Sequence, residues 1–341
     1  MAVSVPEWPV ILDIDNLQVA LFTRRGVLPA VDGLSLTVSA GETIAIVGES
    51  GCGKSLTALA VMRLLPDPPA KIVGGSVRFM GRDLAALTER EMQRVRGKDI
   101  SMIFQDPMTS LNPVTAVGEQ LVEVIRSHDR VSHREAHARA VELLRRVRIP
   151  DAERRMNDFP HQMSGGMSQR VMIAMAIACD PKLLIADEPT TALDVTIQAQ
   201  ILELMKELQA NSGMGLIIIT HDLGVVAETA DRVAVMYAGK KVEEAPVEAL
   251  FERPLHRYTR GLLGATPSAT RRHGNRLAEI AGSVPALSEL PPGCAFQNRC
   301  ADVFDRCRAE RPVLMPLLPA RTAACFAAEE ELSRHGAVVG P

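Results

Sequence analysis

Two stretches of the sequence combine residue types that suit phosphate chemistry. The first, Gly48-Glu-Ser-Gly-Cys-Gly-Lys54-Ser55, lies between an apolar run and a helical pattern. This context favours a phosphate-binding loop over a chance glycine-rich turn, because glycines let backbone N–H groups point at phosphate oxygens and the helix adds its positive end. We expect Lys54 to reach the β- and γ-phosphates of a nucleotide and the Ser55 hydroxyl to bind Mg²⁺. The predicted nucleotide contacts of this loop are Gly48, Ser50, Gly51, Cys52, Gly53, Lys54, Ser55 and Leu56.

The second stretch, Leu183-Leu-Ile-Ala-Asp187-Glu188, is an apolar run that ends in two acids. Open α/β sheets bind ligands at the carboxyl ends of their strands, so these carboxylates stand where a phosphate site would need them. Asp187 suits Mg²⁺ binding through its water shell, and Glu188 suits a general base that activates water. In isolation the pair would also fit a strand that simply ends in solvent. The phosphate-binding loop elsewhere in the same chain favours the catalytic interpretation.

Short β-type runs surround the first of these stretches. Gly26, Gly33 and Gly41 separate the runs, which predict an antiparallel piece leading into a buried strand. A helix from about Leu56 to Leu65 should follow the loop, and Pro66 ends it. The predicted strands are Val10–Ile14, Gln18–Phe22, Leu34–Val38 and Thr43–Val47.

Helical patterns dominate from about residue 107 to 180, and short strands resume beyond them. The later alternation of strand, helix and strand predicts a parallel sheet. We therefore expect an α/β fold, with a P-loop core, an N-terminal antiparallel β subdomain, a helical insertion and a small C-terminal module that carries cysteines. The predicted helices are Gly118–Ser127, Arg134–Arg148 and Thr196–Ala210, and the later strands are Leu183–Ala186 and Leu216–Thr220.

The composition is that of an ordinary soluble globular protein. Of 341 residues, 47% are hydrophobic and 23% charged, and the formal net charge is -3. At roughly 150 residues per domain this length predicts two domains. The near-neutral charge argues against a nucleic-acid binder that works through a large basic field. We expect no signal peptide and, without an apolar run of about 18 residues, no membrane span, so any membrane role should come through partner subunits.

A third stretch, Met163-Ser-Gly-Gly-Met-Ser-Gln169, lies between the two phosphate-site stretches and opens a helix rich in Ala, Met and Ile. Small residues at a helix N-terminus make a further anion site, which a second subunit would be needed to complete. The stretch resembles the LSGGQ signature of ABC ATPases, and this resemblance implies that Ser164, Gly165 and Gly166 contact nucleotide. It departs from the family pattern at Met167, where glutamine is usual. Peptide-importer ATPases commonly have methionine at that position.

The same resemblance implies roles for further residues. Gln105 resembles the Q-loop glutamine, which binds Mg²⁺ and senses the transmembrane partner. Asp194 resembles the D-loop aspartate, and His221 the switch histidine that contacts the γ-phosphate. Phe22 is the nearest candidate for the ring that stacks on adenine, although it is offset by one position, and a buried core ring is the alternative. The implied catalytic residues are Glu188, His221 and Lys54, and the implied Mg²⁺ ligands are Ser55, Gln105 and Asp187.

From about residue 9 to 328 the chain is similar to oligopeptide and dipeptide import ATPases. The tract Gly165–Gln200 and the segments Arg253–Leu263 and Leu290–Cys300 carry this similarity. It implies an ATP hydrolase that powers peptide import as a peripheral subunit on the cytoplasmic side of the inner membrane. Glutathione or antimicrobial peptides are alternative cargoes. The implied partners are a paralogous ATPase that forms a heterodimer, two transmembrane permease subunits and an extracytoplasmic peptide-binding protein, with no nucleic acid.

Four of the six cysteines lie in the last fifth of the chain with the spacing C-x₅-C-x₆-C-x₁₇-C. No secretory signal is expected, so disulfides are a poor explanation. The spacing lacks the C-x₂-C typical of structural zinc, and four thiolates also suit a [4Fe–4S] cluster, which members of the peptide-importer family can hold. We expect such a cluster, with zinc or unmetallated cysteines as alternatives. The residues are Cys294, Cys300, Cys307 and Cys325.

The predicted domains are an ABC ATPase domain over 9–254, with its helical subdomain at about 107–180, and a C-terminal module of the oligopeptide-transporter type over 255–341. One rival is a soluble ABC ATPase of DNA repair or translation, but such proteins usually carry long coiled-coil insertions or two cassettes. A second rival is an iron–sulfur redox sensor with a vestigial ATPase. The complete set of ATPase residues argues against it.

Overall fold

The computed structural model describes residues 9–24, 26–106, 110–191, 193–265 and 280–334. Pro107, where the predicted helical subdomain begins, lies outside the described residues, and so do 266–279 and 335–341 of the predicted C-terminal module. The chain divides into two compact units, each of which is described by itself. The first unit is Met1–Asp13, Thr37–Thr43 and Arg78–Ile219, and the second is Ile14–Leu36, Ile44–Val77 and Thr220–Pro341.

Three parallel strands form the centre of the first unit. Strand β7 (Leu183–Asp187) lies between β6 (Ile100–Ile103) and β8 (Gly215–Thr220), with Leu183 opposite both Ile100 and Gly215. Every residue of these strands is buried. A parallel sheet that is covered on both faces needs such continuous apolar runs, so the predicted strands are confirmed, each with one more residue.

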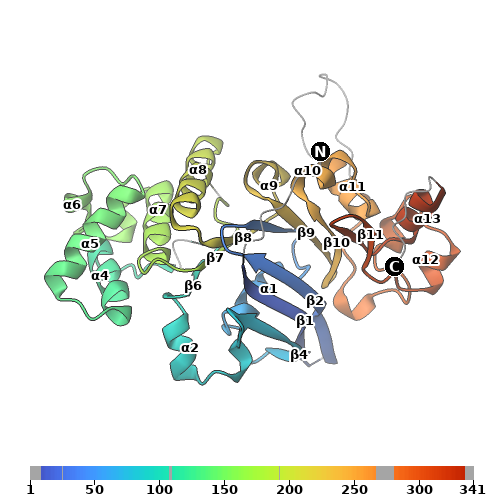
Figure 1. The fold of residues 1–341 in the computed structure, drawn as a ribbon, viewed down its shortest axis with the longest axis horizontal. Helices are drawn as coiled ribbons and strands as arrows, with labels where there is room; N and C mark the ends of the chain where they lie inside the picture. The colour runs from blue at the N-terminus through green and yellow to red at the C-terminus, as the bar shows by residue number, and fades with distance from the viewer. Residues whose placement is uncertain (1–8, 25, 107–109, 192, 266–279, 335–341) are drawn as a thin grey trace. The chain divides into compact units, whose positions relative to one another are not determined.

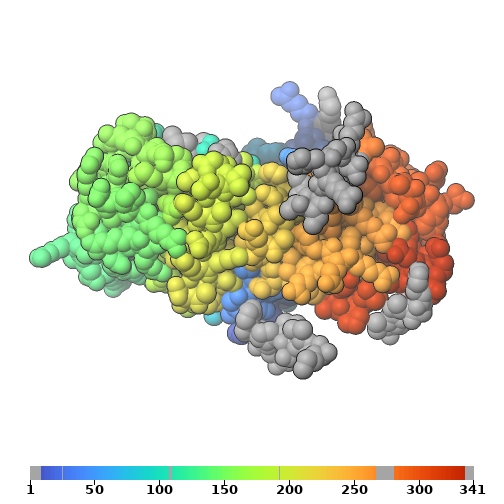
Figure 2. Space-filling view, turned by 90° about the horizontal axis from the view of Figure 1, so that it is seen from above, coloured from blue at the N-terminus to red at the C-terminus, as the bar shows by residue number. Residues whose placement is uncertain are grey.

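Helices α4 (Val117–His128), α5 (His133–Arg146) and α7 (Gly165–Ala176) pack on one another in the first unit (Figure 1) and appear in green in Figure 2. Ser132 starts α5, because its hydroxyl accepts the Glu135 N–H. Both predicted helices here are confirmed, with ends shifted by one or two residues. The other elements of this unit are β5 (Arg82–Asp83), η1 (Leu84–Ala86), α2 (Glu89–Val95), α6 (Ala152–Arg155), η2 (Pro160–Gln162) and α8 (Val195–Ser212).

The second unit contains one parallel strand pair followed by antiparallel strands. The strand order is β3 (Thr43–Val47), β9 (Arg232–Tyr237), β10 (Lys240–Pro246), β12 (Arg321–Ala323) and β11 (Met315–Leu318). The parallel pair is β3 with β9, and Ile44 of β3 lies opposite Arg232 of β9 in parallel register. Strands β9 and β10 are joined by the tight turn Ala238–Gly239, where both residues have positive φ, as the favoured hairpin turns require.

Three aromatic rings form the centre of the core of the second unit. The Tyr237 ring centroid lies 4.6 Å from that of Tyr258 and 5.3 Å from that of Phe296. All three side chains are buried, and they join β9 to the C-terminal segments. The helical elements of this unit are α1 (Lys54–Val61), α9 (Leu223–Thr229), α10 (Val247–Glu252), α11 (Arg257–Gly264), η3 (Leu287–Glu289), η4 (Gln297–Arg299), α12 (Asp305–Ala309) and α13 (Phe326–Arg334).

A separate four-stranded sheet has the order β2-β1-β4-β5. Strand β1 (Val10–Thr23) and strand β2 (Gly26–Ser39) each run through 14 residues, where the sequence predicted short separate runs. Strand β1 continues through Asn16 although its backbone is left-handed there, and the Asn16 N–H donates to Ser35 Oγ at 2.9 Å. Strand β4 (Ala70–Phe79) completes the sheet beside β1.

These elements confirm the predicted α/β fold with an antiparallel β subdomain. Among the helices in the described ranges, none has both the length and the apolar character that a membrane span requires.

Candidate nucleotide-binding site

The predicted phosphate loop lies between β3 and α1 and has no space for a side chain at two of its glycines, Gly48 and Gly53. A Cβ on Gly48 would lie 2.3 Å from the Met236 carbonyl oxygen. A Cβ on Gly53 would lie 2.6 Å from the Ala30 carbonyl oxygen, and both glycines have positive φ. These two positions need glycine because the backbone at Ala30 and Met236 lies against them and because their own backbone has positive φ.

Lys54, the first residue of α1, is only 5% exposed and reaches back across the loop. Its Nζ donates to the Gly48 and Glu49 carbonyl oxygens at 2.8 and 3.1 Å, and lies 3.9 Å from Cys52 Sγ. Burial raises the pKa of the Cys52 thiol, which keeps that side chain neutral inside the loop. The ammonium is thus positioned inside the ring of loop atoms, where the phosphate oxygens of a nucleotide would meet it.

The second predicted group, in the first unit, lies at the end of β7. Asp187 is 6% exposed. Gln105 Nε2 donates to Glu188 Oε2 at 3.0 Å, and the Thr191 hydroxyl donates to the same oxygen at 2.9 Å. The Glu188 backbone is left-handed, with φ of 48°, and its N–H donates to the Ile219 carbonyl oxygen at 2.8 Å. This conformation is uncommon for a non-glycine residue, and here it sets the direction in which the Glu188 side chain leaves the end of β7.

The signature stretch lies in the same unit and forms the start of α7. Ser164 Oγ accepts the Met167 N–H at 3.4 Å, so the serine caps the helix. A Cβ on Gly166 would lie 2.8 Å from Ile197 Cγ2, so glycine allows α7 to approach α8 closely. The Arg170 guanidinium donates to the Val147 carbonyl oxygen at 2.9 Å and so joins the first turns of α7 to the end of α5. The exposed helix start remains available to an anion.

The remaining predicted residues have separate positions. Asp194 Oδ1 accepts the Ile197 N–H at 2.9 Å and so caps α8. Ala192, two positions before Asp194, lies outside the described residues. His221 directly follows β8 and is exposed. Phe22 lies near the end of β1 with 46% of its side chain exposed, which excludes the alternative of a buried core ring.

Serine, glutamine and aspartate oxygens are the hard ligands that Mg²⁺ prefers, so the chemistry of Ser55, Gln105 and Asp187 fits this cation. Ser55 belongs to the second unit, and the other two residues belong to the first. Within the first unit, Gln105 and Glu188 are brought into direct contact although 83 positions separate them.

Comparisons with known proteins agree with this geometry. A family model described as ABC transporter matches residues 31–191, and one described as Oligopeptide/dipeptide transporter, C-terminal region, matches residues 242–307. The probable peptide ABC transporter ATP-binding protein y4tR of Sinorhizobium fredii is 54% identical over 96% of this chain and 98% of its own length. The chain belongs to the ATP-binding proteins of peptide ABC transporters.

Two further matches extend this finding for the ATPase. The oligopeptide transport ATP-binding protein AppD of Bacillus subtilis is 51% identical over 94% of this chain and 98% of its own length. The dimeric structure of a bacterial ABC transporter cassette, MJ0796, matches with a TM-score of 0.63 and 28% identity, and covers 70% of this chain and 99% of the cassette. ATP and Mg²⁺ are therefore the expected substrate and metal, and hydrolysis of ATP is the expected activity.

All four C-terminal cysteines line one small pocket, which has room for about 10 Å³. This is roughly the space of one water molecule and far less than a four-iron cluster occupies. Across the described ranges, no group of three or more His, Cys, Asp or Glu side chains is arranged to hold a metal ion. Burial raises the pKa of the Cys294 thiol to about 11 and also raises that of Cys325. In this structure the four thiols line one pocket but leave no space between them for a cluster.

Sequence reasoning missed the role of Glu49 in the phosphate loop and the two residues that hold it, Arg299 and Tyr258. The Arg299 guanidinium donates to both Glu49 carboxylate oxygens at 2.6 and 2.9 Å, and the Tyr258 hydroxyl accepts the Glu49 N–H at 2.8 Å. Glu49 stands at a variable position of the loop motif, so the motif gives it no role. Its partners are 209 and 250 positions away, and no local pattern in the sequence could join them.

Proposed function

We propose that this chain binds and hydrolyses ATP to power the import of dipeptides or oligopeptides. The observation that carries the proposal is a phosphate loop and a Gln105–Glu188 pair in a chain that matches peptide ABC transporter ATPases over almost its whole length. The match to the oligopeptide/dipeptide C-terminal region supports peptides over glutathione as cargo. The same match favours a transporter over a soluble ABC ATPase of DNA repair or translation.

In this proposal Glu188 is the general base that accepts a proton from the attacking water. Gln105 and Thr191 both donate to one of its carboxylate oxygens, and these two hydrogen bonds orient the carboxylate. Lys54 and the loop N–H groups bind the phosphates, and His221 contacts the γ-phosphate. When bound, Mg²⁺ neutralises charge that develops on the phosphate oxygens, and Ser55, Gln105 and Asp187 would hold it.

We also propose that the start of α7, at Ser164–Gly166, completes the ATP site of a second ATPase subunit. The observation behind this is the exposed, serine-capped helix start, which offers N–H groups to an anion. The match to a dimeric cassette structure supports a pair of subunits. We propose a paralogous ATPase as the second member. Two transmembrane permease subunits and an extracytoplasmic peptide-binding protein complete the transporter, with this chain peripheral on the cytoplasmic side of the inner membrane.

Replacing Glu188 with glutamine tests the proposed base. Glu188→Gln keeps the size of the side chain and one acceptor oxygen for Gln105 and Thr191, but removes the carboxylate that accepts a proton. We expect hydrolysis to fall by a factor of about 10² to 10⁴, as is typical for loss of a general base, while ATP binding is retained. Phosphate release measures the first property, and binding of a fluorescent ATP analogue measures the second. Thr191→Val is the matched control, because it removes a donor to the same oxygen and keeps the carboxylate. Undiminished turnover in Glu188→Gln would exclude Glu188 as the base.

A [4Fe–4S] cluster at the four C-terminal cysteines remains a proposal that rests on their shared pocket and their spacing. Since the pocket is small as placed, cluster binding would have to move the thiols apart. Iron and zinc analysis of anaerobically purified protein, together with absorbance near about 400 nm, tests it. We expect about four irons per chain, lost in Cys300→Ser and kept in Cys179→Ser. Stoichiometric zinc, or neither metal, would overturn the cluster.

A further inference from the structure

Glu49, the second residue of the phosphate loop, is fixed at three points within the second unit. Its carboxylate accepts two hydrogen bonds from Arg299, its N–H donates to the Tyr258 hydroxyl, and its carbonyl oxygen accepts from Lys54 Nζ. Side chain, amide and carbonyl are thus all held, and together they set the orientation of the peptide groups on either side of this residue. The peptides that follow carry the N–H groups that face phosphate.

Arg299 is placed as a rigid support. Its guanidinium side chain is 6% exposed, and it stacks 5.9 Å from the Phe296 ring centroid and 6.0 Å from that of Tyr237. Its Nε donates to the Ala281 carbonyl oxygen at 3.0 Å. The hydrogen bonds to Glu49 raise the pKa of Arg299 above its ordinary value. Because the Arg299 guanidinium is already held by ring stacking and hydrogen bonds, it loses little side-chain conformational entropy when it binds the Glu49 carboxylate.

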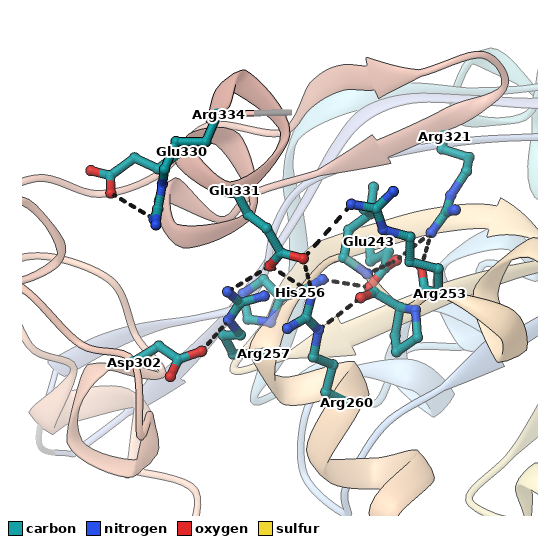
Figure 3. A network of polar contacts seen from close by, with 12 residues as sticks. Glu243, Arg253, His256, Arg257, Arg260, Asp302, Arg321, Glu330, Glu331 and Arg334 are labelled. Atoms are coloured by element: carbon teal, nitrogen blue, oxygen red, sulfur yellow. Dashed lines mark hydrogen bonds and ion pairs between the residues drawn. The ribbon is translucent and has the colours of Figure 1, made fainter. Parts of the chain in front are cut away.

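Tyr258 is the second support, and its helix is anchored by ion pairs. The phenol is fully buried, and burial raises its pKa, so the hydroxyl stays protonated and available to the Glu49 N–H. Tyr258 lies in the first turn of α11. Glu331 of α13 accepts from Arg257 and Arg260 of the same helix at 2.9 and 2.8 Å (Figure 3). The position of the tyrosine is therefore determined by the C-terminal part of the chain.

We propose that Arg299 and Tyr258 are positioning residues for ATP binding, which hold the phosphate loop in its binding conformation through Glu49. This proposal rests on the proposed role of the loop in binding ATP. If Arg299 positions the loop, a shift of the segment that carries Cys294 and Cys300 would change the conformation of the nucleotide-binding loop, because Arg299 adjoins Cys300 and contacts Glu49. Loss of the guanidinium leaves a half-buried carboxylate without its partner, and the carboxylate then turns towards water and takes the loop peptide with it.

The full-length chain carrying Arg299→Met tests the proposal. We expect the Kd and the KM for ATP to rise about tenfold while kcat changes by less than about twofold, because the loop and not the base is disturbed. Arg299→Lys keeps the positive charge but cannot donate two parallel hydrogen bonds to the carboxylate, so we expect the Kd for ATP to rise only about threefold. Glu49→Gln should match Arg299→Met, and the double variant should be no worse than either single variant, since both remove one interaction.

Arg306→Met is the matched control, because Arg306 lies in the same module and pairs with Glu310 and Glu329 instead. Its Kd for ATP should equal that of the wild type. If Arg299→Met melts like the control and binds ATP like the wild type, the proposal is overturned, while hydrolysis and its loss in Glu188→Gln still stand. If Arg299→Met does not fold, Tyr258→Phe and Glu49→Gln decide: a wild-type Kd in both overturns the proposal, and a raised Kd in both supports it.

Discussion

The two helix starts that we propose bind phosphate, those of α1 and α7, are built in different ways. Helix α7 begins at Ser164, whose hydroxyl accepts the Met167 N–H three positions on. Helix α1 begins at Gly53, which is left-handed and is not capped by any side chain of the described residues. Instead, the loop before α1 is enclosed by the Ala30 and Met236 carbonyls and held by residues from the C-terminal segments.

The difference separates a locally specified site from one that depends on tertiary structure. The cap of α7 is local, because Ser164 accepts the Met167 N–H three positions on, although Gly166 also allows the close approach of α8. The loop before α1 has its conformation imposed by distant backbone and by Arg299. We therefore expect the same kind of substitution to cost much more stability at the loop before α1 than at the start of α7.

The largest expected difference is between Gly53→Ala and Gly165→Ala. In the first variant the new methyl group meets the Ala30 carbonyl oxygen at 2.6 Å in a left-handed conformation, so we expect a loss of at least about 2 kcal/mol in stability and loss of ATP binding. In the second, the methyl group lies 3.9 Å from Leu193 Cδ2, an ordinary contact, so stability should change by less than about 0.5 kcal/mol. Thermal melting and binding of an ATP analogue measure both.

Since both variants replace glycine with alanine at the start of a helix, each serves as the control for the other. Equal melting temperatures for the two would contradict the view that tertiary backbone contacts determine the loop. Reduced ATP turnover in Gly165→Ala at unchanged melting temperature would still agree with it, because α7 is proposed to face the nucleotide of a partner subunit.

A smaller effect is expected at the cap of α7. Ser164→Ala removes the side-chain acceptor, and we expect stability to fall by about 0.5 to 1 kcal/mol, near the lower end for caps because the hydrogen bond is long. Ser164→Asp keeps an acceptor at this position and should restore the melting temperature. Thermal melting measures both variants. A loss as large as that of Gly53→Ala would show that α7 also depends on tertiary support.

Much of the fold was predictable because its signals are local. Continuous apolar runs identified β7 and β8, and the helical spacing of apolar residues identified α4, α5 and α8, each within two residues of its ends. Strand β1 was wrongly divided into two runs, and β2 was predicted only from Leu34 to Val38. Asn16 and Gly33 lie at these breaks, and both residue types are common in turns. Here they adopt positive φ inside strands that continue beyond them.

The candidate site was predictable only where a motif covers it. The loop glycines, Lys54, Asp187 and Glu188 follow from spacing and from the strands before them. The left-handed backbone of Glu188 and its contact with Gln105 depend on pairing between β6 and β7, which spacing does not reveal. The support of Glu49 by Tyr258 and Arg299 depends on contacts between segments that only the folded chain brings together.

The Arg299–Glu49 pair also has a consequence for how the protein is made. The two residues are 250 positions apart, so at about 5 to 20 residues per second the ribosome adds Arg299 roughly 12 to 50 s after Glu49. For that interval β3, the loop and α1 exist without one of their fixed supports. The nascent ATPase can thus acquire its parallel strands early, but its phosphate loop reaches its final form only when the last quarter of the chain has been synthesised.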